Sequence, residues 1–171
     1  QQTEAIAQAC SSGLLIITGG PGTGKTTLLN GVLRLYRALG ISCVLAAPTG
    51  RAAKRLSEVT GQDAATIHRL LEATIDPHTG ELFFKRDGQN PLNAKAVIVD
   101  EMSMVDTQLL YSLLLAVPVG KRLIFVGDPD QLPPVGPGFP FADCLRSNML
   151  PAVRLTEIFR QAQESLIVMN A

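Results

Sequence analysis

The chain has 171 residues, of which 46% are hydrophobic and 18% are charged. This composition indicates one folded globular domain and excludes an intrinsically disordered chain. Fifteen basic and fifteen acidic side chains give a formal net charge of zero, so any contact with nucleic acid must be local. No secretory signal or membrane-spanning run is visible, which predicts a cytoplasmic protein without a membrane span. The three scattered cysteines exclude a disulfide framework and a cysteine metal site.

Short apolar runs alternate with helical patterns along the chain. We expect strands at residues 14–18, 42–46, 96–100, 123–127 and 152–155. We expect helices at residues 25–39, 50–59, 65–71, 107–117 and 139–148, and from 161 onward. This alternation predicts an α/β fold with a parallel sheet flanked by helices on both faces, whose ligands bind beyond the carboxyl ends of the strands. Turn signals interrupt the pattern at residues 74–93, where we expect an inserted loop or hairpin.

A glycine-rich segment between the first strand and its helix has the pattern G-x-x-x-x-G-K-T. Its residues are Gly19, Gly20, Pro21, Gly22, Thr23, Gly24, Lys25, Thr26 and Thr27. Glycines allow backbone N–H groups to face phosphate oxygens, and the helix that follows adds unpaired donors and a positive dipole end. In such a loop Lys25 reaches the β- and γ-phosphates and the Thr26 hydroxyl binds Mg²⁺. The segment therefore predicts a nucleoside triphosphate site.

Two adjacent carboxylates end the apolar strand at residues 96–100. Asp100, at the tip of the strand, suits the Mg²⁺ shell of a nucleotide site. Glu101 can polarise the water that attacks the γ-phosphate, which favours hydrolysis over transfer to a small acceptor. The alternative is that both residues only cap a strand in solvent.

A proline-rich loop follows the strand at residues 123–127. Its prolines stiffen the loop, and Gln131 can donate to a phosphate while it accepts from a water. Gln131 is therefore a candidate sensor of the γ-phosphate. Composition alone leaves open a plain connector with a solvated glutamine.

These motifs together resemble the first RecA-like domain of superfamily 1 DNA helicases of the B group, and within that group the RecD/TraA family. The matching stretches are residues 19–27, 47–53, 66–71, 99–106, 127–135 and 155–161, in the family's order. The resemblance implies a RecA-like P-loop NTPase fold, with ATP and Mg²⁺ as cofactors. It also implies an ATP-driven helicase or translocase that moves 5′ to 3′ on single-stranded DNA, and partners in recombination, repair or conjugation.

The resemblance assigns further roles around the nucleotide. Gln2 matches the glutamine that reads adenine, and Gln131 matches the glutamine that contacts the γ-phosphate. Arg160 matches an arginine that reaches the γ-phosphate within the same chain, where a guanidinium stabilises transition-state charge. The implied catalytic set is Lys25, Glu101, Gln131 and Arg160.

The helix at residues 50–59 has an apolar and a charged side. We expect the core face to contain Ala52, Ala53, Leu56 and Val59, and the opposite face to contain Arg51, Lys54, Arg55 and Glu58. Taken alone, the charged side is more typical of a solvated helix face than of a DNA contact.

The resemblance implies contacts to single-stranded DNA from residues 48–51 and from Thr66 and His68, and we also expect the loop at Pro134 and Val135 to lie along the strand. The residues concerned are Pro48, Thr49, Gly50, Arg51, Thr66, His68, Pro134 and Val135. Hydroxyl and N–H groups at the start of a helix can hold a backbone phosphate, so we expect contacts that do not depend on base sequence. The shortage of aromatic residues argues against extensive base stacking.

The chain starts at Gln1 without a methionine and stops at Ala171 inside an expected helix. We therefore expect a fragment of a longer helicase whose second RecA-like domain is absent. Such a fragment should bind nucleotide weakly, hydrolyse it poorly and fail to unwind duplex DNA. Two other functions stay open, namely an RNA-stimulated ATPase of the same superfamily and a nucleotide-dependent regulatory subunit without motor activity.

Overall fold

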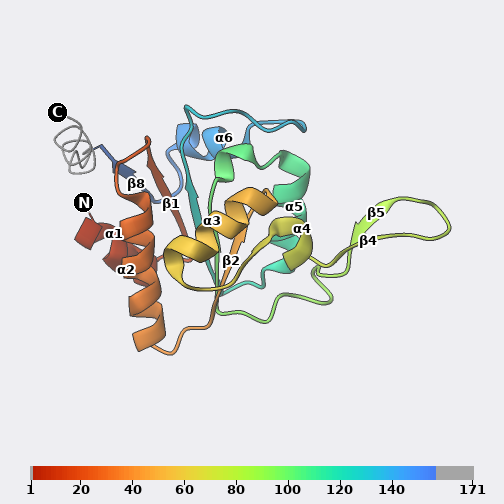
Figure 1. Cartoon of the computed structure of the whole chain (residues 1–171), viewed down its shortest axis with the longest axis horizontal. Coiled ribbons are helices and arrows are strands. Elements are labelled where there is room, and N and C mark those ends of the chain that lie inside the picture. Colours follow the sequence, from red (N-terminus) through yellow and green to blue (C-terminus); the bar gives the residue numbers. More distant parts are fainter. Residues whose placement is uncertain (1, 157–171) are drawn as a thin grey trace, which may run out of the picture.

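Six parallel strands form the centre of the protein (Figure 1). The structure is a computed structural model, and it describes residues 2–156. Along the sheet the strand order is β3-β2-β6-β7-β1-β8. The strands are β1 (Leu14–Gly19), β2 (Cys43–Ala47), β3 (Ala64–Thr66), β6 (Ala96–Val99), β7 (Arg122–Gly127) and β8 (Ala152–Leu155). The expected parallel sheet is therefore confirmed, and its carboxyl ends meet at one edge.

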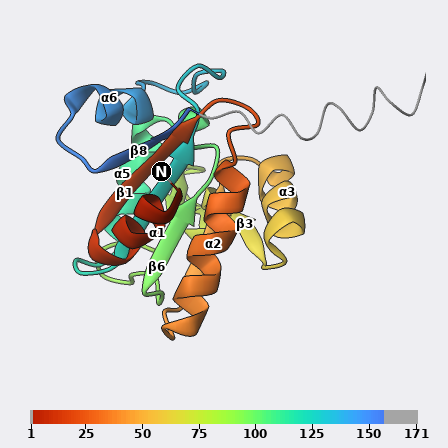
Figure 2. The ribbon, with the colours of Figure 1, turned by 90° about the vertical axis from the view of Figure 1, so that its left-hand side faces the viewer.

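Helices cover both faces of this sheet. One face carries α1 (Gln2–Ser11), α2 (Lys25–Ala38) and α3 (Gly50–Thr60), and Figure 2 shows α1 and α2 on the viewer's side of the strands. The other face carries α4 (Ile67–Leu70), the 3₁₀ turn η1 (Met102–Met104), α5 (Thr107–Ala116) and α6 (Pro140–Ser147). Along β1, Leu15 and Ile17 pack toward the first face and Ile16 toward the second, which is the alternation of a strand buried on both sides.

Most expected elements are present, with ends that differ by one or two residues. The helix expected at residues 65–71 is wrong in its first part. Ala64, Ala65 and Thr66 instead pair with Leu45–Ala47 as an edge strand, so sheet pairing prevails over the helix propensity of alanine. Helix α4 begins only after Thr66, whose hydroxyl accepts a hydrogen bond from the Arg69 N–H at 3.1 Å.

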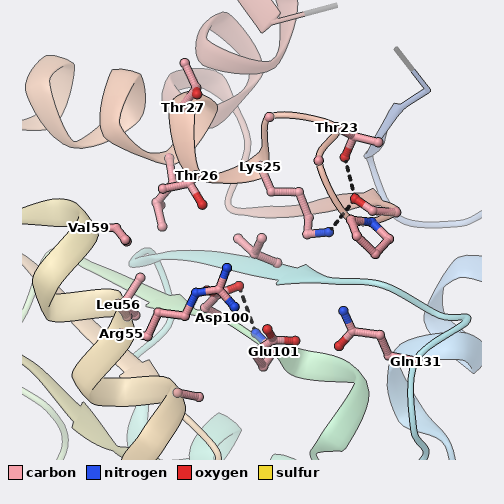
Figure 3. A pocket seen from close by; sticks show the side chains of 17 residues that line it. Thr23, Lys25, Thr26, Thr27, Arg55, Leu56, Val59, Asp100, Glu101 and Gln131 are labelled. Carbon is pink, nitrogen blue, oxygen red and sulfur yellow. Dashed lines mark hydrogen bonds between the residues drawn. The ribbon is translucent and has the colours of Figure 1, made fainter. Parts of the chain in front are cut away.

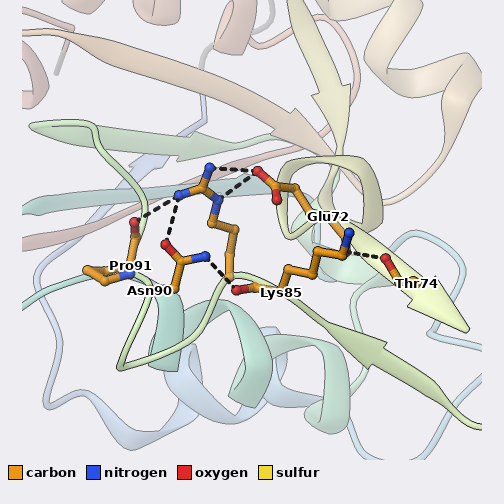
Figure 4. A network of polar contacts seen from close by, with 6 residues as sticks. Glu72, Thr74, Lys85, Asn90 and Pro91 are labelled. Carbon is orange, nitrogen blue, oxygen red and sulfur yellow. Dashed lines mark hydrogen bonds and ion pairs between the residues drawn. The ribbon is translucent and has the colours of Figure 1, made fainter. Parts of the chain in front are cut away.

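A two-stranded antiparallel hairpin projects from the body of the protein between α4 and β6 (Figure 1). It consists of β4 (Ala73–Ile75) and β5 (Leu82–Phe84) and begins one residue before residues 74–93, where turn signals interrupt the sequence pattern. Polar contacts around Arg86 hold its base, including an ion pair with Glu72 at 2.6 Å and a hydrogen bond to Asn90 at 3.3 Å (Figure 4). The Phe84 ring packs on His68 of α4, with centroids 5.7 Å apart.

The sequence indicated that the three cysteines are unpaired, and no membrane-spanning run was visible in it. Cys10, Cys43 and Cys144 are free thiols, each partly buried against the core. Among residues 2–156, no helix combines the length and the apolar character that crossing a bilayer requires.

Helix α1, which the sequence analysis did not predict, is fastened to α2 by one buried hydrogen bond. The Tyr36 hydroxyl donates to the Ala9 carbonyl at 2.6 Å, and both residues are 1% exposed. Ala5 and Ala9, one turn apart, belong to the same core cluster. The small residues at this spacing allow α1 to approach the sheet closely, and this is the sequence signal for α1.

Removing this hydroxyl tests how firmly α1 is held. Tyr36→Phe leaves the Ala9 carbonyl without its partner and should lower the free energy of unfolding by about 1 kcal/mol in urea titration. Tyr111→Phe is the control, because Tyr111 is 62% exposed and its loss should change stability by less than about 0.5 kcal/mol. Equal effects of the two substitutions would contradict this role of Tyr36.

Candidate active site

A pocket of about 390 Å³ opens at the carboxyl edge of the sheet, where β1, β7 and β6 end (Figure 3). The loop after β1 forms one wall, and Asp100 and Glu101 after β6 lie across from it. Val126 of β7 and Gln131 of the following loop also line the pocket. The structure thus brings together Lys25, Thr26, Asp100 and Glu101, which the sequence analysis selected from separate stretches.

The glycine-rich loop at residues 19–24 is held by its own polar groups. Thr23, which is 5% exposed, donates its hydroxyl hydrogen to the Gly20 carbonyl at 2.8 Å. The Lys25 ammonium donates to the carbonyls of Gly19 and Gly20, at the inside of the loop. Gly24 has φ 86° at the start of α2, a left-handed conformation that a side chain would strain. The loop is therefore already folded around the position expected for phosphates.

Gly19 is required where β1 passes into the loop. A Cβ atom at this position would lie 2.6 Å from the Thr23 Oγ1 atom and 2.7 Å from the Leu155 carbonyl oxygen of β8. Because one of these atoms belongs to the backbone, no rotamer change relieves the clash. The first glycine of the motif thus serves packing between β1, the loop and β8.

The two carboxylates after β6 sit in a partly buried and strained segment. Glu101 has φ 52°, in the left-handed region, and its N–H donates to the Asp100 Oδ1 atom at 2.9 Å. Residues in such conformations cost energy and cluster at functional sites. Burial raises the pKa of Asp100, and the charges of Lys25 and Arg55 only partly oppose this. Burial, and next the Asp100 charge, raise the pKa of Glu101.

The loop after β7 is anchored at Asp128. This residue is 3% exposed, and its carboxylate accepts a hydrogen bond from the Asp130 N–H at 3.1 Å. The Gln131 N–H donates to the Asp128 carbonyl at 3.2 Å, which leaves the exposed Gln131 side chain directed to the pocket (Figure 3). Gln131 is thus carried by a fixed backbone turn.

Several candidates for DNA contact, at residues 48–51, 66 and 68, follow β2 and β3 at the same edge of the sheet. Ala47 pairs with Thr66, so the segment of Pro48 and Thr49 neighbours Thr66. The Thr49 hydroxyl accepts from the Ala52 N–H at 3.2 Å and, like that of Thr66, keeps its own hydrogen for a further acceptor. His68 is directed against the hairpin through Phe84.

Other predicted site residues are less well placed by the structure. Pro134 and Val135 lie on the loop between β7 and α6, with Val135 fully exposed. Gln2 is the first residue of α1, and its side chain lies outside the described part of the chain. Arg160 and the helix expected from residue 161 lie outside the described residues.

Helix α3 differs from the sequence interpretation. Its pocket-lining residues are Ala52, Arg55, Leu56 and Val59, at the spacing of one helix face. Val59 is 40% exposed rather than buried in the core, and Arg55 is exposed and lines the pocket. The helical period correctly separated Ala53 and Leu56, which are buried, but it could not show that α3 also borders the pocket.

A glycine-rich loop between a buried strand and a helix, facing an acidic strand end, defines a P-loop NTPase domain. Residues 2–137 match the family model described as an AAA domain. The chain therefore belongs to this family, and its relatives place it among RecD-like superfamily 1 helicases as a RecA-like domain.

Two of the curated relatives are ATP-dependent DNA helicases by name. The chain is 42% identical to the ATP-dependent RecD2 DNA helicase of Deinococcus radiodurans, over 100% of this chain and 23% of the relative. It is 40% identical to the ATP-dependent DNA helicase dda of Enterobacteria phage T4, over 71% of this chain and 28% of the relative. The crystal structure of Pif1 helicase from Candida albicans matches with a TM-score of 0.68 and 27% identity, over 98% of this chain and 42% of that chain. The chain thus spans roughly a quarter of these curated relatives.

Asp100→Asn tests the cost of the buried carboxylate. Because folding raises the pKa of Asp100, the stability contributed by this group falls as the pH rises above the ordinary aspartate value of about 3.9. The asparagine avoids this loss and can still accept from the Glu101 N–H. We expect the variant to melt at a higher temperature than the wild type near neutral pH, with the gap closing below about pH 4.

The control for this experiment is Asp63→Asn, because Asp63 is exposed on the loop before β3. Its melting temperature should equal that of the wild type at each pH. An Asp100→Asn variant that melts no higher than the wild type at neutral pH would contradict the cost assigned to this carboxylate.

Proposed function

We propose that this chain is the ATP-binding and hydrolysing motor domain of a longer helicase that moves 5′ to 3′ on single-stranded DNA. The observation that carries the proposal is the pair Asp100 and Glu101, which faces the phosphate-binding loop across one pocket. A domain that only bound nucleotide would not need a second carboxylate in a strained backbone conformation at this place.

In the proposed site, the loop amides and Lys25 hold the β- and γ-phosphates of ATP. Thr26 and Asp100 line the same pocket and offer the oxygen ligands that Mg²⁺ prefers, so the residues present fit this ion. Bound Mg²⁺ would neutralise phosphate charge. A bound cation would also offset the desolvation that raises the pKa of Asp100.

Hydrolysis is assigned to groups on the other side of the pocket. Glu101 orients and deprotonates the attacking water, and Gln131 contacts the γ-phosphate from the stiff loop after β7. Arg160 adds a guanidinium to the developing charge, and Gln2 recognises adenine. These last two roles come from the resemblance to RecD-like helicases, and they remain predictions here.

Single-stranded DNA is proposed to cross the edge of the sheet at Pro48, Thr49, Gly50 and Arg51, continuing past Thr66 and His68 to Pro134 and Val135. The free hydroxyl hydrogens of Thr49 and Thr66 and the exposed Arg51 are suited to phosphates. Such contacts would hold the strand without reading its sequence.

A second RecA-like domain of the parent protein is proposed to form the other wall of the cleft, so that closure on ATP moves the strand. The isolated chain should bind nucleotide weakly and should not unwind duplex DNA. Partners in recombination, repair or conjugation and a cytoplasmic location stay predictions.

The proposed hydrolysis is tested with Glu101→Gln in the full-length protein. The amide cannot accept the proton of the water, so we expect the turnover of ATP with single-stranded DNA to fall by about 100-fold or more. Binding of a labelled nucleotide should stay within about threefold of the wild type, because Glu101 acts on the water. A variant with full activity would instead support a regulatory role.

The proposed DNA contact is tested with Arg51→Ala, again in the full-length protein. The affinity for an oligothymidine should fall, and the slope of log K against log salt should decrease by about 0.7. Lys54→Ala is the matched control, because Lys54 is 81% exposed and pairs with Glu58 at 4.0 Å. Identical salt slopes for both variants and the wild type would place the DNA elsewhere.

A further inference from the structure

Helix α3 borders two sites at once. Its first residues belong to the proposed DNA-contacting segment, and the face formed by Ala52, Arg55, Leu56 and Val59 lines the nucleotide pocket. Ala52 belongs to both, because its N–H is capped by the Thr49 hydroxyl while the residue lines the pocket. A displacement of the first turn of α3 would therefore move the residues of α3 that line the pocket directly.

Arg55 is the cationic group on this pocket-facing side. Figure 3 shows its side chain extending from α3 toward Asp100, across the pocket from the phosphate-binding loop. Within residues 2–156 it makes no ion pair, and its guanidinium is free to follow a charge that changes during the reaction. Lys25, the other cation beside the carboxylates, is instead bonded to loop carbonyls.

Arg51 and Arg55 are four residues apart and thus lie on neighbouring turns of one helix side. A phosphate bound by Arg51 and Thr49 would fix the first turn of α3, and this would fix the turn that carries Arg55. The guanidinium of Arg55 attracts the neighbouring carboxylates, so its position favours one orientation of the Glu101 side chain.

We propose that Arg55 is a positioning residue that transmits DNA binding at the start of α3 to Glu101 and the attacking water. This inference rests on the proposed function, and it adds the route by which single-stranded DNA stimulates hydrolysis. Arg55 acts through the carboxylates after β6 rather than by holding the nucleotide. Its removal therefore affects turnover and leaves the binding of ATP and DNA in place.

The test compares Arg55→Gln, Arg55→Lys and Lys54→Gln in the full-length protein. ATP turnover is measured over a range of ATP concentrations, with and without oligothymidine. For Arg55→Gln we expect the ratio of kcat with DNA to kcat without DNA to fall about tenfold. The KM for ATP and the Kd for the oligothymidine should stay within about twofold of the wild type. Arg55→Lys keeps the charge and should recover most of the ratio.

Lys54→Gln removes a neighbouring cation that pairs with Glu58 and does not line the pocket, so it should behave as the wild type. Melting curves verify that the variants are folded. We expect them to be folded, because Arg55 is exposed and its replacement leaves the core unchanged. The inference is overturned if Arg55→Gln keeps the wild-type ratio, if it changes only the KM for ATP, or if it weakens DNA binding. If DNA does not stimulate the ATP turnover of the wild type, the proposed function is overturned together with this inference. If DNA stimulates the wild type and Arg55→Gln equally, only the inference about Arg55 fails.

Discussion

The position of β1 between β7 and β8 is the constraint on which the nucleotide site depends. Leu14–Thr18 pair with Leu123–Gly127 on one side, and Ile16–Gly19 pair with Ala152–Leu155 on the other. This register places Gly19 against the Leu155 carbonyl, where only a glycine fits, and so fixes where the phosphate-binding loop begins. The parallel pairing of β7 with β6 then brings Asp100 to the same edge.

Several features of the site lower the stability of the folded state, and burial of the hydrophobic core must offset this loss. Asp100 is desolvated, Glu101 has a left-handed backbone, and Lys25 uses its ammonium to hold loop carbonyls. Two buried clusters, one on each face of the sheet, provide the stabilisation that permits this. Bound Mg²⁺ and phosphates would complement the arrangement, since they bring the charges that it lacks.

The sequence was sufficient to predict the elements whose pattern is local. Apolar runs such as the one at β1 indicate a strand by themselves, and the G-x-x-x-x-G-K-T pattern by itself indicates a phosphate-binding loop. Features that depend on tertiary contacts were missed. The edge strand at Ala64–Thr66 exists because β2 offers a partner, and α1 is held by Ala9 and Tyr36. Likewise, the pocket-facing role of Arg55 follows from where α3 packs against β2 and β3, which no helical period can show.

The proposed function requires that this domain couples ATP hydrolysis to single-stranded DNA. To test this coupling, ATP turnover of the full-length wild-type protein is measured with equal concentrations of oligothymidine and oligouridine of one length. We expect strong stimulation by the DNA and little by the RNA. Equal stimulation by both, or greater stimulation by the RNA, would contradict the proposed function and indicate an RNA-stimulated ATPase.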